Sequence, residues 1–207
     1  RLKVLGAKHW GDEHLFARLL ARRQARGLLT AGSSAGAKQL CSVLGTRGES
    51  RYFREGFHLA RDLAVEVHYD GRWARALRRS AARKKRCFWF GLPNDSGLAV
   101  ASGRLAPGLD WQLVRFVLDT SWDSPRDHWH VKTRQGMKID HFYGDGRHWA
   151  FNDGEALLMV KKRGNRHFRD AWIASAGRIL DYASQQELPF SNLGEVLEAI
   201  RQSRRRR

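Results

Sequence analysis

The chain has 207 residues, of which 42% are hydrophobic, so it is long enough for one globular domain with a sizeable core. This apolar content, with eight Trp and ten Phe, excludes a disordered chain, and no apolar run approaches the roughly 20 residues of a membrane span. The formal net charge of +17 favours acidic or polyanionic partners, although the basic runs at 78–86 and 201–207 are of a kind that is commonly solvated surface.

The first half of the sequence alternates between predicted strands and predicted helices. Apolar runs bounded by Gly, Asp or Pro predict strands at 2–5, 28–29, 63–69, 87–92 and 98–102. Apolar residues at helical spacing predict helices at 12–26 and 72–85, and a shorter one at 37–40. A strand, a helix and a strand in this order indicate a parallel α/β unit.

The pattern becomes β-rich from residue 108 onward. Short strands between Gly/Asp turns are predicted at 111–118, 129–132, 138–143, 149–151 and 156–161. Two helices are predicted at the end, one over 168–185 and one over 193–202 that Ser191 and Asn192 cap. We therefore expect an α/β core over residues 1–107, with a mostly parallel central sheet and helices on both faces. A β-rich extension with two C-terminal helices, residues 108–207, should pack on this core.

The stretch from Leu28 to Leu40, LLTAGSSAGAKQL, has the pattern of a nucleophile elbow: a strand, a tight turn with a central serine, and a helix. Such a turn strains the backbone of the nucleophile, and only very small neighbours, here Gly32 and Gly36, avoid a clash with it. The hydroxyl of Ser34 would then lie beside backbone N–H groups that favour a developing negative charge. A Gly/Ser-rich loop without catalysis is the alternative interpretation.

Three segments together resemble the cyanophycinase and aspartyl-dipeptidase (peptidase E) family of serine peptidases. Residues 32–37, GSSAGA, resemble the elbow of that family. Residues 56–70, GFHLARDLAVEVHYD, resemble its histidine block, and residues 90–100, FGLPNDSGLAV, resemble its acidic block. The resemblance covers roughly residues 1–102 and implies a class I glutamine-amidotransferase-like fold. It also implies an N-terminally truncated member, because family members have further sequence before the turn at 6–8.

The resemblance implies that Ser34 is the nucleophile and His68 the general base. A serine hydroxyl is a poor nucleophile until a base within hydrogen-bond reach removes its proton, and an imidazole suits that task near neutral pH. The backbone N–H groups of Ala35 and Ala7 would form the oxyanion hole, although Ala7 stands in a Gly-Ala-Lys turn where the family has Gly-Gly-Asn. The alternative for His68 is an ordinary core or loop histidine.

The acidic member of the implied triad departs from the family pattern. Asn94 stands in the place of the family glutamate, and Asp95 follows it. Either Asp95 orients His68 by a shift of one residue, or the triad is weakened. A catalytically impaired relative is therefore an open alternative.

Arg72 and Arg75 resemble the arginines that follow the family histidine, and guanidinium groups are suited to gripping a substrate carboxylate. The sequence thus predicts a hydrolase that cleaves peptide or isopeptide bonds next to acidic residues. The alternatives are a pseudoenzyme and a basic protein that binds polyanions.

The remaining motifs indicate little further chemistry. Histidines and aspartates gather in the β-rich half without the spacing of a metal site, so we expect no metal or other cofactor: Asp127, His128, His130, Asp140, His141, Asp145 and His148. The basic helix with Trp73 mixes basic and aromatic residues, so nucleic acid is an alternative partner. It is the weaker alternative, because no RNA- or DNA-binding signature accompanies the helix. No membrane partner is expected. Cys41 and Cys87 show no disulfide pattern, which favours a reducing, cytoplasmic location.

Overall fold

The computed structural model describes residues 15–44, 54–119, 137–162 and 164–205, which form two compact units. The first unit contains the described residues up to 94 together with 139–150, and the second contains those of 95–119, 137–138 and from 151 onward. The domain boundary expected at 107/108 lies in the turn between two paired strands of the second unit. No helix in this described part of the chain is long and apolar enough to cross a membrane.

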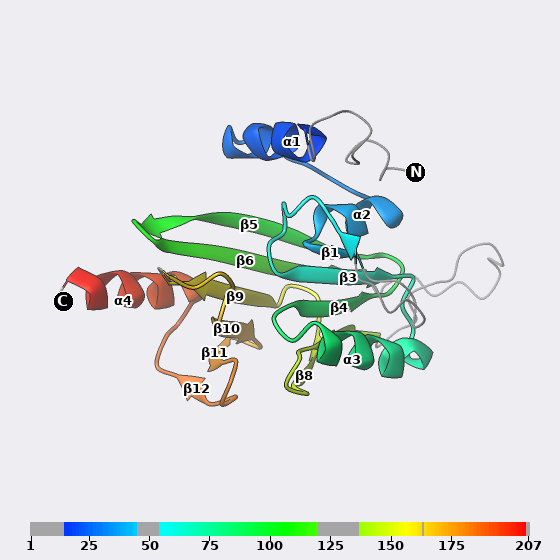
Figure 1. The fold of residues 1–207 in the computed structure, drawn as a ribbon. Coiled ribbons are helices and arrows are strands. Elements are labelled where there is room, and N and C mark those ends of the chain that lie inside the picture. Colours follow the sequence, from blue (N-terminus) through cyan, green and yellow to red (C-terminus); the bar gives the residue numbers. More distant parts are fainter. Residues whose placement is uncertain (1–14, 45–53, 120–136, 163, 206–207) are drawn as a thin grey trace. The chain divides into compact units, whose positions relative to one another are not determined.

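The first unit is built around a four-stranded sheet in the order β3-β4-β7-β8 (Figure 1). Its elements in chain order are α1 (Leu15–Ala25), α2 (Ala35–Leu40), β1 (Val43–Leu44), β2 (Arg54–Glu55), β3 (Leu63–Val67), a 3₁₀ turn (Gly71–Trp73), α3 (Ala74–Arg83), β4 (Phe88–Leu92), β7 (Ile139–Phe142) and β8 (His148–Phe151). β3 and β4 are parallel, whereas β7 runs antiparallel to β4. α3 connects β3 to β4, and its buried face, Leu77 and Ala81, packs on a cluster that includes Ala64 and Trp89.

The second unit is a six-stranded sheet in the order β12-β11-β10-β9-β6-β5, with one helix. Its elements are β5 (Ser96–Ala106), β6 (Leu109–Leu118), β9 (Ala156–Lys161), β10 (Asp170–Ser175), β11 (Arg178–Asp181), β12 (Glu187–Leu188) and α4 (Leu193–Arg205). Every pair of neighbours in this sheet is antiparallel. The helix α4 begins as the sequence predicted, because Asn192 Oδ1 accepts a hydrogen bond from the backbone N–H of Glu195 at 3.1 Å. Its Val196 packs against Leu109 and Leu158 of the sheet.

The expected fold class, a mostly parallel central sheet of the class I glutamine-amidotransferase-like kind with helices on both faces, is wrong. β3 and β4 are the parallel neighbours within the described sheets, and the larger sheet is entirely antiparallel. A parallel pair needs a long crossover such as α3, whereas the short turns at 107–108 and 176–177 reverse the chain between β5 and β6 and between β10 and β11. Leu28 and Leu29 form no strand, and Leu29 is 94% exposed.

The helix predicted over 168–185 is also wrong, because this segment folds as the hairpin of β10 and β11. Ala176 and Gly177 both have positive φ angles, 49° and 75°, and such a two-residue turn matches the twist of the strands on either side of it. Ala171 and Ile173 are buried while Trp172 and Ala174 are half-buried, an alternation that belongs to a strand. The sequence pattern predicted a helix here because short apolar runs are compatible with both a helix and a strand.

His141 on β7 is fully buried and lies between Phe88 and Phe90, with ring centroids 5.7 and 4.7 Å away. Its Nδ1–H donates a hydrogen bond to the carbonyl oxygen of Trp89 at 3.0 Å, since a carbonyl can only accept. Burial lowers the pKa of His141 to about 3, although the bond to Trp89 opposes this shift. The side chain is therefore a neutral member of the core.

We expect this buried histidine to make the first unit less stable in acid. The unfolded imidazole binds its proton near pH 6.5, whereas the folded one does so only at about 3, so stability falls as the pH drops through this window. This single group should lower the free energy of unfolding by ~1.4 kcal/mol per pH unit inside the window. Urea unfolding between pH 7 and 4 should show a shallower pH dependence in His141→Asn than in the wild type, and equal slopes would contradict the prediction.

Candidate active site

Ser34 lies in a strained turn between residues 28–33, which form neither helix nor strand, and α2. Its backbone angles, φ 50° and ψ −119°, lie in a region that residues with a side chain rarely adopt. A Cβ atom on Gly32 would lie 2.7 Å from the carbonyl carbon and oxygen of Gly36, so position 32 has no room for a side chain. A Cβ atom on Gly36 would meet nothing within 4 Å. The steric requirement of the turn therefore falls on Gly32.

The parallel pairing of β3 with β4 brings His68 and Asn94 together. Val67, the last residue of β3, is paired with Leu92, the last residue of β4. His68 follows β3 directly and Asn94 follows β4 by two residues, so both leave the sheet at the same edge. His68 also has a positive φ of 53°. The sheet edge thus presents two polar side chains from segments 26 residues apart.

Ser34, His68 and Asn94 form a hydrogen-bonded chain at an exposed site. The Ser34 Oγ lies 3.0 Å from His68 Nε2, and His68 Nδ1 lies 2.7 Å from Asn94 Oδ1. Because the amide oxygen of Asn94 can only accept, the proton of the neutral imidazole is on Nδ1. Nε2 then carries the lone pair and accepts the hydrogen bond from the Ser34 hydroxyl. This is the tautomer that a general base for Ser34 needs.

The other predicted triad and oxyanion residues are placed as follows. Asp95 is exposed with a φ of 57°, it belongs to the second unit, and its backbone carbonyl accepts a hydrogen bond from the N–H of Asp119 at 2.9 Å. Ala35 is the first residue of α2 and follows Ser34 directly, as an oxyanion donor would. Ala7 lies outside the described residues. The resemblance assigns a carboxylate to the position beside the imidazole of His68, and in this structure the amide of Asn94 occupies that position.

The two predicted substrate-binding arginines differ in their surroundings. Arg72 donates to both oxygens of Asp70, with its Nη2 2.6 Å from Oδ2, and this hydrogen bonding raises the pKa of its guanidinium. Asp70 also accepts from the backbone N–H of Arg72 and so begins the 3₁₀ turn before α3. Arg75 is exposed at the start of α3. The guanidinium of Arg72 is thus paired with a carboxylate, and among these two arginines Arg75 is the one more accessible to an acidic substrate.

Sequence reasoning missed an ion pair between the elbow helix and the strand that precedes His68. The ammonium of Lys38 donates to both carboxylate oxygens of Glu66, at 3.0 and 2.9 Å. Both side chains are largely buried, with 17% and 10% of their surface exposed. A lysine one turn after the elbow serine and a glutamate two residues before the histidine were the only signals in the sequence.

Within the described part of the chain, neither the cysteines nor the acidic and histidine residues of the β-rich half add a reactive group to this site. Cys41, at the end of α2, is a buried free thiol whose pKa burial raises to about 12, so it is a poor nucleophile. Among the residues that the structure describes, no three His, Cys, Asp or Glu side chains gather as metal ligands would. His148 instead bonds to Asp140 at 3.1 Å, and the hydroxyl of Tyr69 donates to the same carboxylate at 2.6 Å. The predicted cluster residues 127, 128 and 130 lie outside the described part.

No protein-family model matches the chain, and a search of curated proteins finds no match to its sequence. The resemblance to cyanophycinase and peptidase E therefore remains an interpretation that depends on the three motifs.

Exchanging each elbow glycine for alanine tests whether the turn positions Ser34. Gly32→Ala places a methyl group 2.7 Å from a backbone carbonyl, so the turn must shift. Since a misplacement of about 1 Å can cost roughly a hundredfold in rate, we expect this variant to lose most of its reaction with a fluorophosphonate probe. Gly36→Ala is the matched control, with open space for its methyl group, and should react like the wild type. Equal reaction of both variants would show that the turn does not position the hydroxyl.

Proposed function

We propose that the chain is a serine hydrolase in which Ser34 is the nucleophile and His68 the general base. The observation that supports it best is the chain of hydrogen bonds from Ser34 through His68 to Asn94, which starts at a strained serine. Strained backbone conformations cluster at functional sites, because a residue without a role gains nothing from them. Serine, base and orienting group in this order are the arrangement by which a hydroxyl is activated.

The reaction would follow from these positions. The Ser34 Oγ attacks the carbonyl carbon of the scissile bond while its proton moves to Nε2 of His68. The N–H of Ala35, with that of Ala7 as the second donor in this proposal, stabilises the negative charge on the carbonyl oxygen. His68 then passes the proton to the leaving amine, and a water molecule releases the acyl group from Ser34 by the same steps in reverse.

Asn94 would serve as an orienting group that carries no charge. Exchanging the triad aspartate of a serine protease for asparagine lowers kcat about 10⁴-fold by producing the wrong tautomer. Here the amide oxygen of Asn94 faces Nδ1, so the correct tautomer is held, as in the Cys-His-Asn triads of papain-like proteases. Among the described residues, no carboxylate bonds to His68 to stabilise the imidazolium that forms during the reaction. The proposal is therefore a working but electrostatically weakened triad.

The proposed substrate class is a peptide or isopeptide with acidic groups beside the scissile bond, as in the peptidase E and cyanophycinase family that the motifs resemble. Arg75 would bind the substrate carboxylate, and Arg72 would do so only in competition with Asp70. A cytoplasmic location belongs to the same proposal, and the free thiols of Cys41 and Cys87 are compatible with it.

Labelling with a fluorophosphonate tests the proposed nucleophile. The probe forms a covalent bond with an activated serine, so the wild type should be labelled and Ser34→Ala should not. Ser33→Ala is the matched control, because it removes a neighbouring exposed hydroxyl outside the hydrogen-bonded chain. Mass spectrometry should place the adduct on Ser34. A folded wild-type protein that stays unlabelled would overturn the hydrolase proposal.

Two substitutions separate the contributions of Asn94 and Asp95. Asn94→Asp keeps the shape of the side chain and adds the missing charge, so it should raise kcat with little change in KM. Asp95→Asn should leave kcat nearly unchanged if the amide of Asn94 is the orienting group. A strong loss of kcat in Asp95→Asn, with no gain in Asn94→Asp, would instead assign the orienting role to Asp95.

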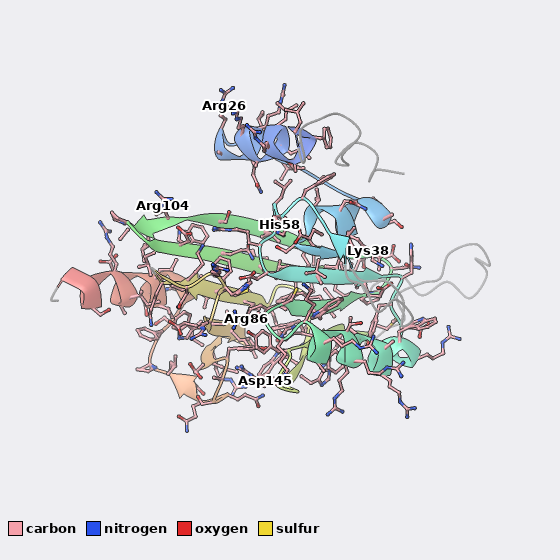
Figure 2. All side chains as sticks on the ribbon, in the orientation of Figure 1. Arg26, Lys38, His58, Arg86, Arg104 and Asp145 are labelled. Atoms are coloured by element: carbon pink, nitrogen blue, oxygen red, sulfur yellow. The ribbon has the colours of Figure 1, made fainter. Side chains whose placement is uncertain are left out.

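A second candidate function, binding of a polyanion by a protein without catalysis, is favoured by the surface of α3. Leu77 and Ala81 face the core of the first unit. Basic side chains are exposed along the rest of this helix and the turn after it: Arg75, Arg78, Arg79, Arg83, Lys84, Lys85 and Arg86. Figure 2 shows many nitrogen-tipped side chains around α3. Such a surface attracts nucleic acids and other polyanions, with an affinity that falls steeply as salt rises. The fluorophosphonate experiment separates the two candidates, since a pseudoenzyme with a polyanion-binding helix would not be labelled.

A further inference from the structure

The short helix α2, which begins directly after Ser34, lacks the usual means of fixing a helix in place. It has six residues, none of its side chains is fully buried, and no side chain caps its first turn. A helix of this length is unstable by itself, because the unfavourable free energy of nucleation exceeds the stabilisation from its few hydrogen bonds. Contacts with the rest of the first unit must therefore hold α2, and with it the serine.

Between the described residues, the backbone hydrogen bonds that join α2 to the rest of the first unit come from the last turn of the helix, away from Ser34. The carbonyl oxygens of Gln39 and Leu40 accept from the N–H groups of Phe57 and Ala60, at 2.7 and 2.9 Å. These bonds leave the helix free to pivot at its other end, where a small rotation would move the Ser34 hydroxyl relative to His68. A side-chain restraint against this rotation is needed.

Lys38 provides that restraint, since its ammonium donates to both oxygens of Glu66 on β3. Lys38 follows Ser34 by four residues, a rise of about 6 Å along a helix. Glu66 precedes His68 by two residues, a span of about 6.6 Å along a strand. The ion pair and the Ser34–His68 hydrogen bond thus join the same two segments at nearly matched spacing.

We propose that the Lys38–Glu66 ion pair is a positioning device that sets the distance between Ser34 and His68. A pair with two hydrogen bonds to one carboxylate resists both sliding and rotation, which an apolar contact does not. Its low exposure excludes most of the water that would weaken it. The inference rests on the proposed function for its catalytic consequence, but its geometric content concerns only the bond between Ser34 and His68.

The test combines a reaction rate with a measurement that needs no activity. The rate is that of fluorophosphonate labelling at a temperature well below unfolding. The second readout is the ¹⁵N resonance of His68 Nε2, which reports whether the ring accepts a hydrogen bond from Ser34. The spectrum of Ser34→Ala supplies the reference for a lost bond, and His68→Gln assigns the resonance among the nine histidines of the chain.

We expect Lys38→Met and Glu66→Gln each to lower the labelling rate about a hundredfold and to move the His68 resonance towards the Ser34→Ala position. Lys38→Arg keeps a bidentate donor and should recover most of the rate. The double variant Lys38→Met/Glu66→Met leaves no buried charge unpaired, so it should fold even if the single variants do not. It should show the same displaced resonance.

Lys161→Met is the matched control. Lys161 pairs with Asp110 in the second unit at 3.2 Å, with a similar exposure of 22% and 17%. It should lose stability without any change in labelling rate or His68 resonance. If the Lys38 variants behave like this control, the ion pair is merely structural and the inference is overturned. If the wild type is not labelled at all, the proposed function fails, and the His68 resonance alone supports or overturns the positioning role.

Discussion

The candidate site depends above all on the parallel register between β3 and β4. Val67 opposite Leu92 ends both strands at the same level, so that His68 follows β3 directly and Asn94 follows β4 by two residues. The N–H of Tyr69 continues the pairing by donating to the carbonyl of Leu92 at 2.9 Å. A shift of this register by one residue would turn alternate side chains to the other face of the sheet and separate the imidazole from the amide. The buried face of α3 supports the register, because Leu77 packs among residues of this sheet.

The two residues that would carry the chemistry are among seven described residues other than glycine that have a positive φ angle. Ser34 and His68 both have positive φ angles, and each such conformation costs of the order of 1–3 kcal/mol. The surrounding contacts must over-determine these conformations for them to persist. For Ser34 they include the close approach of Gly32 to the carbonyl of Gly36 and the bond that the N–H of Gly36 donates to Ser33 at 2.8 Å. The site is thus rigid in its backbone while its hydroxyl and imidazole remain exposed.

The two units differ in the physical origin of their sheets. In the first unit a helical crossover of ten residues, α3, allows two strands to run in parallel. In the second unit short turns, such as Ala176–Gly177, reverse the chain and every neighbouring strand is antiparallel. The long pairing of β5 with β6 and the cover that α4 gives to one face build a core that is independent of the candidate site. The candidate site and this larger sheet therefore make separate demands on the sequence.

The sequence alone identified the elements whose cause is local. The requirement for Gly32 in the elbow, the helix over α3 and the Asn192 cap of α4 depend on residues within a few positions of one another, so their patterns are visible in one segment. The matching requirement expected at Gly36 is absent, because a Cβ atom there would meet nothing within 4 Å. Several strands of the β-rich half were also predicted close to their observed bounds, because alternation and turn residues are local signals. The β10–β11 hairpin was not predicted, because the adjacent apolar residues of this segment fit the repeat of a helix as well as that of a strand.

Tertiary structure alone decided which segments meet. Whether a predicted strand pairs in parallel depends on its neighbours, and the mostly parallel sheet was wrong because later strands pair through short turns. Asn94, and not the expected Asp95, bonds to His68. Which of the two residues does so depends on where β4 ends and on the direction of one side chain, and residue spacing in the sequence does not encode either. The Lys38–Glu66 pair spans 28 residues and joins a helix to a strand. A contact of this kind has no local pattern, because its energy arises only when two distant segments exclude water together.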